Sequence, residues 1–255
     1  MVNPNYAPGQ VSQGRVAEID EGLRAHMTKV YALMTGAMVV TGLVAYVFGS
    51  DLKALMQGQE TSLLPAGLLV TIYGSPLKWA VIFAPLIMVF AFSAMINRMS
   101  ASTAQTVFWV FGGLMGLSLA SIFAIYTGES IARVFFITAI AFGGLSIYGY
   151  TTKKDLSGFG TFLMMGVIGL VVASIVNIFL ESSALQWAIS VIGLLVFAGL
   201  TAYDTQSIKN EYLQMRGVPG GEAWLEKGAV MGALRLYLDF INMFMFLLQF
   251  LGNRE

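Results

Sequence analysis

Seven long apolar segments, separated by polar connections, dominate the hydrophobic pattern of this 255-residue chain. An α-helix needs about 20 apolar residues to cross the hydrocarbon core of a bilayer, and each segment has roughly that length. The segments lie at 27–48, 77–97, 105–126, 131–150, 159–180, 184–207 and 228–251. A further apolar stretch, 63–73, is too short to span and is typical of an interfacial or re-entrant piece. The pattern predicts an all-α polytopic membrane protein with seven transmembrane helices.

The composition of the chain agrees with a membrane location. Hydrophobic residues make up 57% of the sequence and charged residues only 11%, too few to cover a water-soluble globule of this size. The lipid bilayer is therefore an expected partner. Basic residues are scattered and the formal net charge is +0, so the sequence lacks the basic patch of a nucleic-acid-binding protein. The absence of cysteine excludes disulfide bonds and thiolate metal sites.

The segments divide the chain into a polar N-terminal tail (1–26), a membrane domain (27–251) and a short C-terminal tail (252–255). The N-terminal tail has no apolar run, so we expect no cleaved signal peptide. Basic residues concentrate on one side of the predicted bundle, which the positive-inside rule assigns to the cytosol. They are Arg15, Arg24, Lys29, Arg98, Lys153, Lys154, Lys209, Arg216 and Lys227, against Lys53, Lys78, Arg133 and Arg254 on the other side. We therefore expect a cytosolic N-terminus and an extracytosolic C-terminal tail.

Few polar side chains lie deep inside the predicted spans. Arg235, Asp239 and Asn242 lie on the last segment, at intervals of four and three residues that place them on one side of a helix. Asp204 lies near the end of the preceding segment, and Asn177 lies in the fifth. A charged group inside a membrane is costly, so it is a functional candidate that faces the interior of the bundle. We therefore expect the last helix to be central in the bundle.

Asp204 and Asp239 are the central candidate pair. Two carboxylates in contact cannot both ionise at low cost, so such a pair holds one proton between them and titrates as a unit. Loss of that proton adds repulsion between the two helices, which a nearby arginine can offset. Two sets of contacts whose balance depends on proton number are sufficient for a gate. The structural alternative is an ion pair between Arg235 and Asp239 within one helix, with Asp204 capping a helix end.

Three short motifs resemble those of a known family of membrane proteins. They are Lys-Lys-Asp-Leu-Ser at 153–157, Ala-Tyr-Asp-Thr-Gln at 202–206 and Leu-Tyr-Leu-Asp-Phe-Ile-Asn at 236–242. Together with the number of helices and the short C-terminal tail, they are similar to the Bax inhibitor-1 (TMBIM, UPF0005) family in its bacterial form. The resemblance implies a seven-helix bundle around a central seventh helix in the bacterial cytoplasmic membrane. It also implies a pH-sensitive calcium leak, with calcium and protons as the ions handled, no bound cofactor and no enzymatic activity.

The resemblance implies roles for individual residues. Asp204 and Asp239 match the two aspartates that share a proton as the pH sensor. They are also the expected calcium ligands, weak and transient because calcium prefers about six to eight oxygen ligands. Arg98, at the end of the second segment, matches the arginine that latches Asp204 in the closed state, and Arg235 is the competing counter-ion. The supporting polar residues are Tyr203, Asn242 and Asn177.

Two other functional classes stay open. Intramembrane aspartyl proteases also carry Tyr-Asp on the sixth helix and an aspartate on the seventh, and Tyr203 with Asp204 fits that template. Asp239 does not fit it, because Leu-Tyr-Leu at 236–238 stands in place of the Gly-x-Gly that opens the helix to a substrate. A non-transporting membrane protein that binds and modulates a membrane protease, or another membrane partner, is the main alternative.

Overall fold

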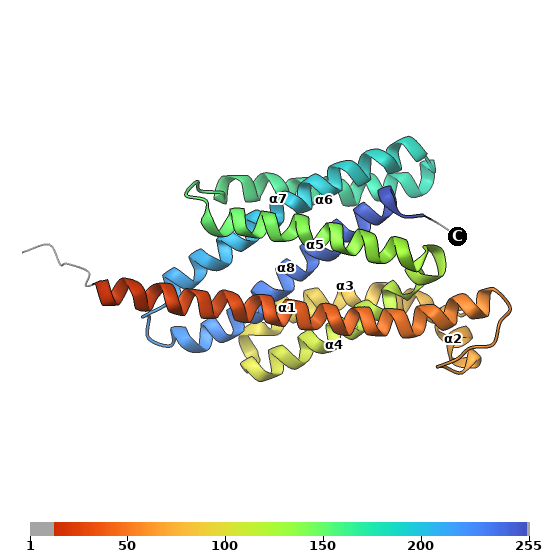
Figure 1. Cartoon of the computed structure of the whole chain (residues 1–255), viewed down its shortest axis with the longest axis horizontal. Helices are drawn as coiled ribbons and strands as arrows, with labels where there is room; N and C mark the ends of the chain where they lie inside the picture. Colours follow the sequence, from red (N-terminus) through yellow and green to blue (C-terminus); the bar gives the residue numbers. More distant parts are fainter. Residues whose placement is uncertain (1–12, 254–255) are drawn as a thin grey trace, which may run out of the picture.

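The computed structural model describes the backbone of residues 13–253 and the side chains of residues 21–253. Within these residues the chain is almost entirely helical and contains no β-strand (Figure 1). The elements are α1 (Gln13–Met56), α2 (Ala66–Tyr73), α3 (Leu77–Met95), the 3₁₀ turn η1 (Ile96–Arg98), α4 (Ala101–Ile125), α5 (Gly128–Thr151), α6 (Ser157–Leu180), α7 (Ser183–Met215) and α8 (Gly221–Leu251). In this described part, α1 and α3 to α8 are the 7 helices long and apolar enough to cross a membrane. The predicted fold class is confirmed.

The first helix begins well before the apolar segment that predicts it. Residues 13–26, which lie in the predicted polar tail, belong to α1 and continue the first helix beyond its apolar segment. The reason is an apolar stripe, because Leu23 and Met27 are buried and continue the helical spacing that leads to the fully buried Val30. Residues 1–12 of the predicted tail lie outside the described residues.

The last two helices are each about two turns longer than predicted, at the end of the bundle where α1 begins. The chain turns between them at Gly217 and Gly220, whose φ angles of 75° and 77° lie in the left-handed region that favours glycine. We call this end of the bundle the basic end, because it also holds Lys153, Lys154 and Lys209. The extension of α7 brings Glu211 into contact with Arg235 of α8.

The short apolar stretch 63–73 forms α2 at the end of the bundle opposite the basic end. The loop before it is held by Asp51 of α1, whose carboxylate accepts hydrogen bonds from the backbone N–H groups of residues 62–64 at 2.9, 2.8 and 2.6 Å. The hydroxyl of Tyr73 donates to the carbonyl of Leu117 in α4 at 2.9 Å. Burial raises the pKa of Tyr73 to about 12, so its hydroxyl remains a donor at neutral pH. These contacts fix α2 against α1 and α4.

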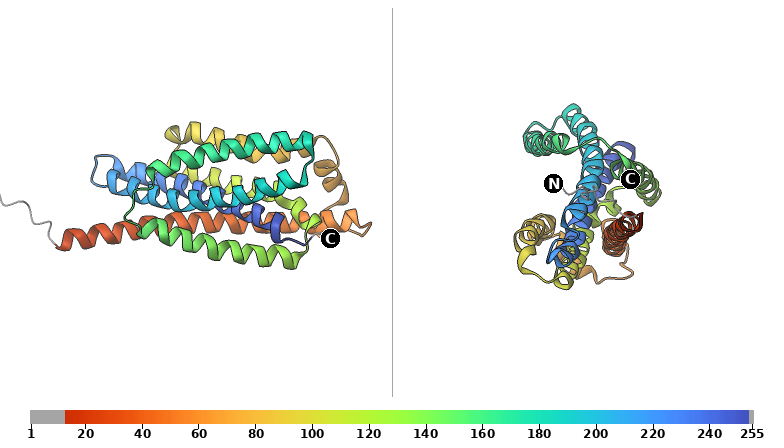
Figure 2. Two further views of the ribbon diagram at one scale, coloured as in Figure 1. Left: turned by 90° about the horizontal axis from the view of Figure 1, so that it is seen from above. Right: turned by 90° about the vertical axis from the view of Figure 1, so that its left-hand side faces the viewer.

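The centre of the bundle is α8. Buried residues make up 61% of its most apolar 18-residue stretch, compared with 11% in α3 and α6 and at most 33% in the other spanning helices. It packs against α1, α4, α5 and α7, and the view along the bundle in Figure 2 shows it surrounded by them. A helix with this environment can carry polar side chains away from lipid. The expected central position of the last helix is confirmed.

Glycines allow the closest approaches between helices. A methyl group on Gly149 of α5 would lie 2.2 Å from the backbone oxygen of Ala202 in α7. One on Gly116 of α4 would lie 2.7 Å from the backbone oxygen of Thr41 in α1. Inside a bilayer the hydrophobic effect does not drive helices together, so close backbone contact of this kind supplies much of the packing energy. The contact at Gly149 also fixes the part of α7 that carries Asp204.

Candidate acid pair at the bundle centre

The candidate site is built around two buried carboxyl groups on adjacent helices. Asp204 of α7 is 9% exposed and Asp239 of α8 is 3% exposed. Each carboxyl group lies close enough to the other to interact with it directly. Two ionised carboxylates are acceptors only, so a hydrogen bond between the two groups would require a proton on one of them. The structure therefore brings together the two aspartates that the sequence singles out.

The hydroxyl groups of the two threonines nearest the pair donate their hydrogen bonds to backbone carbonyls and not to the carboxyl oxygens of the pair. Thr201 and Thr205 are fully buried on α7 beside Asp204, but each donates to a carbonyl of its own helix, Thr201 to that of Phe197 at 2.9 Å and Thr205 to that of Thr201 at 2.8 Å. No N–H or hydroxyl group of the described chain donates to Oδ2 of Asp239. A proton on one of the two carboxyl groups would allow them to form a hydrogen bond with each other.

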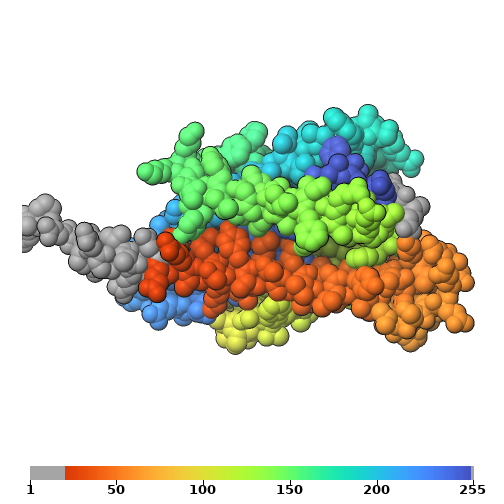
Figure 3. All heavy atoms as spheres, in the orientation of Figure 1, coloured from red at the N-terminus to blue at the C-terminus, as the bar shows by residue number. Residues whose placement is uncertain are grey.

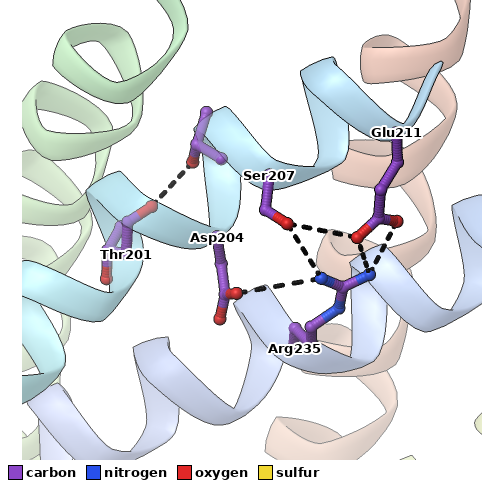
Figure 4. Close-up of polar contacts among 6 residues, drawn as sticks. Thr201, Asp204, Ser207, Glu211 and Arg235 are labelled. Carbon is purple, nitrogen blue, oxygen red and sulfur yellow. Dashed lines mark hydrogen bonds and ion pairs between the residues drawn. The ribbon is translucent and has the colours of Figure 1, made fainter. Parts of the chain in front are cut away.

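Arg235 lies between the pair and a third acid. Its Nη2 donates to both carboxylate oxygens of Glu211 at 2.9 Å, and its Nη1 lies 3.9 Å from Oδ1 of Asp204 (Figure 4). Ser207 adds a hydrogen bond to Glu211 at 3.1 Å. The short contacts to Glu211 are charge-assisted hydrogen bonds, whereas the longer distance to Asp204 is an ion pair without one. The guanidinium group is thus held mainly by Glu211 and faces the acid pair at its other edge.

Sequence reasoning missed Glu211 because the predicted segment ended at residue 207. The signal was present, since Asp204, Ser207 and Glu211 lie three and four residues apart and share one face of a helix that continues to Met215. The drop in hydropathy after residue 207 indicates where the apolar part ends, and the backbone stays helical beyond it. The same extension explains how Arg235 reaches an acid on α7.

Arg98, predicted to latch Asp204, lies elsewhere in this structure. It belongs to η1, is exposed at the basic end, and forms no ion pair with any described residue. The chain turns sharply there, because Ser100 caps α4 by accepting a hydrogen bond from the N–H group of Thr103 at 3.1 Å. Arg235 is the arginine that the structure brings to the aspartates, and the latch role of Arg98 stays a prediction.

The three supporting polar residues make contacts away from the pair. The ring of Tyr203 lies against Gly160 of α6. Asn242 donates to the carbonyl of Leu238 in its own helix at 2.8 Å. Asn177 lies at the far end of α6, where it accepts a hydrogen bond from the N–H group of Ser182 at 3.1 Å and thereby holds the turn into α7. The structure does not join these side chains to the carboxyl pair.

The donor set does not form a resident metal site. Residues 21–253 contain no group of three or more histidine, cysteine, aspartate and glutamate side chains placed to hold an ion. Two carboxyl groups that face an arginine offer calcium far fewer than its preferred six to eight oxygens.

The structure also bears on the protease alternative. α8 is an unbroken α-helix through Asp239, without the opening that the protease motif produces.

Seven apolar helices, with α8 at their centre and a buried acid pair inside, define a polytopic membrane protein that carries ionisable groups inside its bundle. The family profile described as "Inhibitor of apoptosis-promoting Bax1" matches residues 23–255. The chain belongs to this family, the Bax inhibitor-1 family, so the resemblance carried by the three motifs is confirmed. It is a multi-pass bacterial membrane protein.

Several bacterial proteins are similar along nearly their whole length. The inner membrane protein YbhL of Escherichia coli (strain K12) is 45% identical over 236 residues, which cover 92% of this chain and 94% of the relative. An uncharacterized protein of Caulobacter vibrioides is 46% identical over 259 residues, covering 99% and 98%. An uncharacterized protein of Rickettsia prowazekii is 43% identical over 251 residues, covering 98% and 99%.

Proposed function

We propose that this protein is a calcium leak channel whose opening is controlled by protonation of Asp204 and Asp239. The observation that supports it is the direct interaction between these two buried carboxyl groups, one on α7 and one on the central helix. Buried acids are an expensive way to pack membrane helices, which small residues and hydroxyl groups achieve at lower cost. A change in the proton number of this pair acts directly on the contact between α7 and α8.

The proton controls the contact through electrostatics. With one proton present, the two carboxyl groups attract each other through a hydrogen bond. Without it, two negative charges face each other in surroundings of low dielectric constant, where repulsion is stronger than in water. Arg235, whose Nη1 lies 3.9 Å from Asp204, is the cation placed to offset that repulsion. Deprotonation therefore favours a second arrangement in which Arg235 moves towards the pair.

Arg235 cannot approach Asp204 more closely and also keep its present hydrogen bonds to Glu211. Arg235 gives Nη2 to Glu211 in two hydrogen bonds of 2.9 Å, so a closer approach to Asp204 loosens contacts at the basic end of α7. Two sets of contacts with similar free energy, chosen by one proton, form a switch. In this mechanism calcium is the transported ion, and its weak attraction to the carboxylates suits passage rather than storage.

The test is a calcium flux measurement in liposomes. Purified protein in calcium-free vesicles should admit calcium at a rate that changes with pH. The variants Asp204→Asn and Asp239→Asn should each reduce the pH dependence strongly, because neither can form a carboxyl pair that gains and loses a shared proton. Glu129→Gln is the matched control, since Glu129 is an exposed acid paired only with Arg133 one turn away. Unchanged flux and pH response in both aspartate variants would contradict the proposal.

A further inference from the structure

A groove opens on the side of the bundle between α1 and α5, with α8 at its floor (Figure 3). Its volume is about 730 Å³, within the range of about 300–1,000 Å³ that is usual for small-molecule sites. The floor is aromatic, with the rings of Phe135 and Phe142 packed against Phe240 at centroid distances of 5.4 and 5.5 Å. The groove lies apart from the contacts of Arg235 and Glu211.

Two polar groups of the groove are without partners. Ser146 of α5 lines it and is 6% exposed, yet its hydroxyl oxygen makes no hydrogen bond within the described chain. Such a buried hydroxyl normally finds a partner, because an unsatisfied one costs about 1–3 kcal/mol. Arg24 of α1 lies at the rim of the groove, at the basic end, and its exposed guanidinium group forms no ion pair with any described residue. The groove thus offers a hydrogen-bond donor inside and a positive charge at its mouth.

The two unpartnered groups lie at the same end of a long apolar channel. α1 and α5 run in opposite directions, so Arg24 lies near Tyr150 while Met38 lies near Phe135. Fourteen residues of helix separate Arg24 from Met38, which is about 21 Å at 1.5 Å per residue. One half of the hydrocarbon core of a bilayer is about 15 Å thick. The groove therefore extends from the membrane surface through one leaflet.

We propose that this groove binds one anionic phospholipid of the surrounding leaflet. The headgroup phosphate pairs with Arg24, since a guanidinium group matches phosphate with parallel charge-assisted hydrogen bonds. Ser146 donates its hydroxyl to an ester carbonyl below the headgroup, and an acyl chain lies along the aromatic floor. Basic pockets between membrane helices are suited to anionic headgroups. This inference does not depend on the calcium leak, because it uses a different face of the bundle.

A lipid fits the groove better than a second protein does. The mouth of the groove faces the bilayer, where acyl chains are present at high concentration. A partner helix packed over the rim would bury Arg24, at a substantial desolvation cost unless it supplied an acid to pair with it. A phospholipid keeps that guanidinium group at the membrane surface and supplies the opposite charge. The positive charge at one end of the groove matches an anionic headgroup, and the apolar channel matches an acyl chain.

The groove can be blocked without a clash. A side chain at Gly143 of α5 would enter open space and occupy the groove, because no atom lies within 4 Å of a methyl group built there. Gly144, the next residue, is equally open but does not line the groove. Gly143→Leu and Gly144→Leu therefore form a matched pair that changes helix propensity equally. Arg24→Gln removes the charge at the exposed rim, and Ser146→Ala removes the hydroxyl group inside the groove. Neither substitution breaks a hydrogen bond or ion pair within the described chain.

The experiment combines native mass spectrometry with thermal unfolding of the full chain in detergent. The probes are phosphatidylglycerol, phosphatidylethanolamine with the same acyl chains, and glycerol phosphate as a headgroup without chains. The wild type should bind one phosphatidylglycerol and should unfold at a higher temperature with it than with either other probe. Gly143→Leu should lose this binding and Gly144→Leu should keep it. Arg24→Gln should lose about tenfold in affinity, and Ser146→Ala should bind more weakly while folding as well as the wild type without lipid.

Three results would overturn the inference. Equal binding of phosphatidylglycerol by Gly143→Leu and Gly144→Leu would show that the lipid sits elsewhere. Equal stabilisation by glycerol phosphate would show that the groove plays no part. A dimeric mass that disappears in Gly143→Leu would identify a second copy of the chain as the occupant. If Gly143→Leu does not fold, the test rests on Arg24→Gln. An unchanged preference of that variant for phosphatidylglycerol would also overturn the inference.

Discussion

At the scale of single residues, Arg235 is where the charges of the site meet. Its planar guanidinium group donates to both oxygens of Glu211 along one edge and approaches Asp204 along another. A lysine could not hold both acids in this fixed geometry, because its ammonium group is a single compact charge. Arg235 thus couples the acid pair in the bundle to the exposed end of α7. A substitution can change whether Arg235 pairs mainly with Glu211 or with Asp204.

Neutralising Glu211 should move the pH response of the flux. In Glu211→Gln, Arg235 loses its charged partner and is free to pair with Asp204. A closer cation stabilises the deprotonated pair, so the pH at the midpoint of the flux response should fall by about one unit. Arg235→Gln should raise that midpoint, because the stabilising cation is removed. The measurement is liposome flux titrated from acidic to alkaline pH.

Glu222→Gln is the control for this pair of variants. Glu222 is an exposed acid in the first turn of α8, at the same end of the bundle, and makes no contact with Arg235. The pH at the midpoint of the flux response of Glu222→Gln should match that of the wild type. Equal shifts in Glu211→Gln and Glu222→Gln would mean that net charge, rather than the contact between Arg235 and Glu211, sets the response.

At the scale of helices, α5 and α7 are held together by a backbone contact at Gly149. Gly149→Ala should lower the free energy of unfolding by about 1–3 kcal/mol, because the added methyl group would meet the rigid backbone oxygen of Ala202 at 2.2 Å. The higher helix propensity of alanine opposes this loss but is worth only about 1 kcal/mol. The measurement is the unfolding midpoint in detergent.

The comparison variant for this helix contact is Gly144→Ala. No atom lies within 4 Å of a methyl group at Gly144, so only the gain in helix propensity remains and stability should rise slightly. If Gly149→Ala proved as stable as Gly144→Ala, the close approach of α5 to α7 would not be a feature of the folded protein.

At the scale of the whole molecule, the basic residues predict how the bundle is inserted. We expect the basic end, with Lys153, Lys154 and Lys209, to face the cytosol. With 7 spans, the C-terminus then lies on the other side. An alkaline phosphatase fused to the C-terminus should be active, and a green fluorescent protein fused there should stay dark. The same reporters on the N-terminus should give the reverse, and a fluorescent C-terminal fusion would refute the orientation.

The sequence allows the fold to be predicted well and the site only in part. Apolar length predicts the seven spans, and the polar stripe of Arg235 and Asp239 predicts the central helix, because both properties are local. Hydropathy cannot show where a helix ends once it leaves the bilayer, so the extension that carries Glu211 was missed. It also cannot show which arginine reaches Asp204, since that depends on how α7 and α8 pack. Contacts between helices, unlike spans, are not encoded in a local pattern.

The burial of α8 has a consequence for how the protein is made. Chains are synthesised from the N-terminus, so the helix around which the others pack leaves the ribosome after α1 to α7. Until α8 is inserted, Asp204 has neither Asp239 nor Arg235 beside it. A chain that stops before α8 exposes an unpaired acid inside the membrane, which quality-control proteases can recognise. The acid pair therefore cannot assemble until α8 has been synthesised.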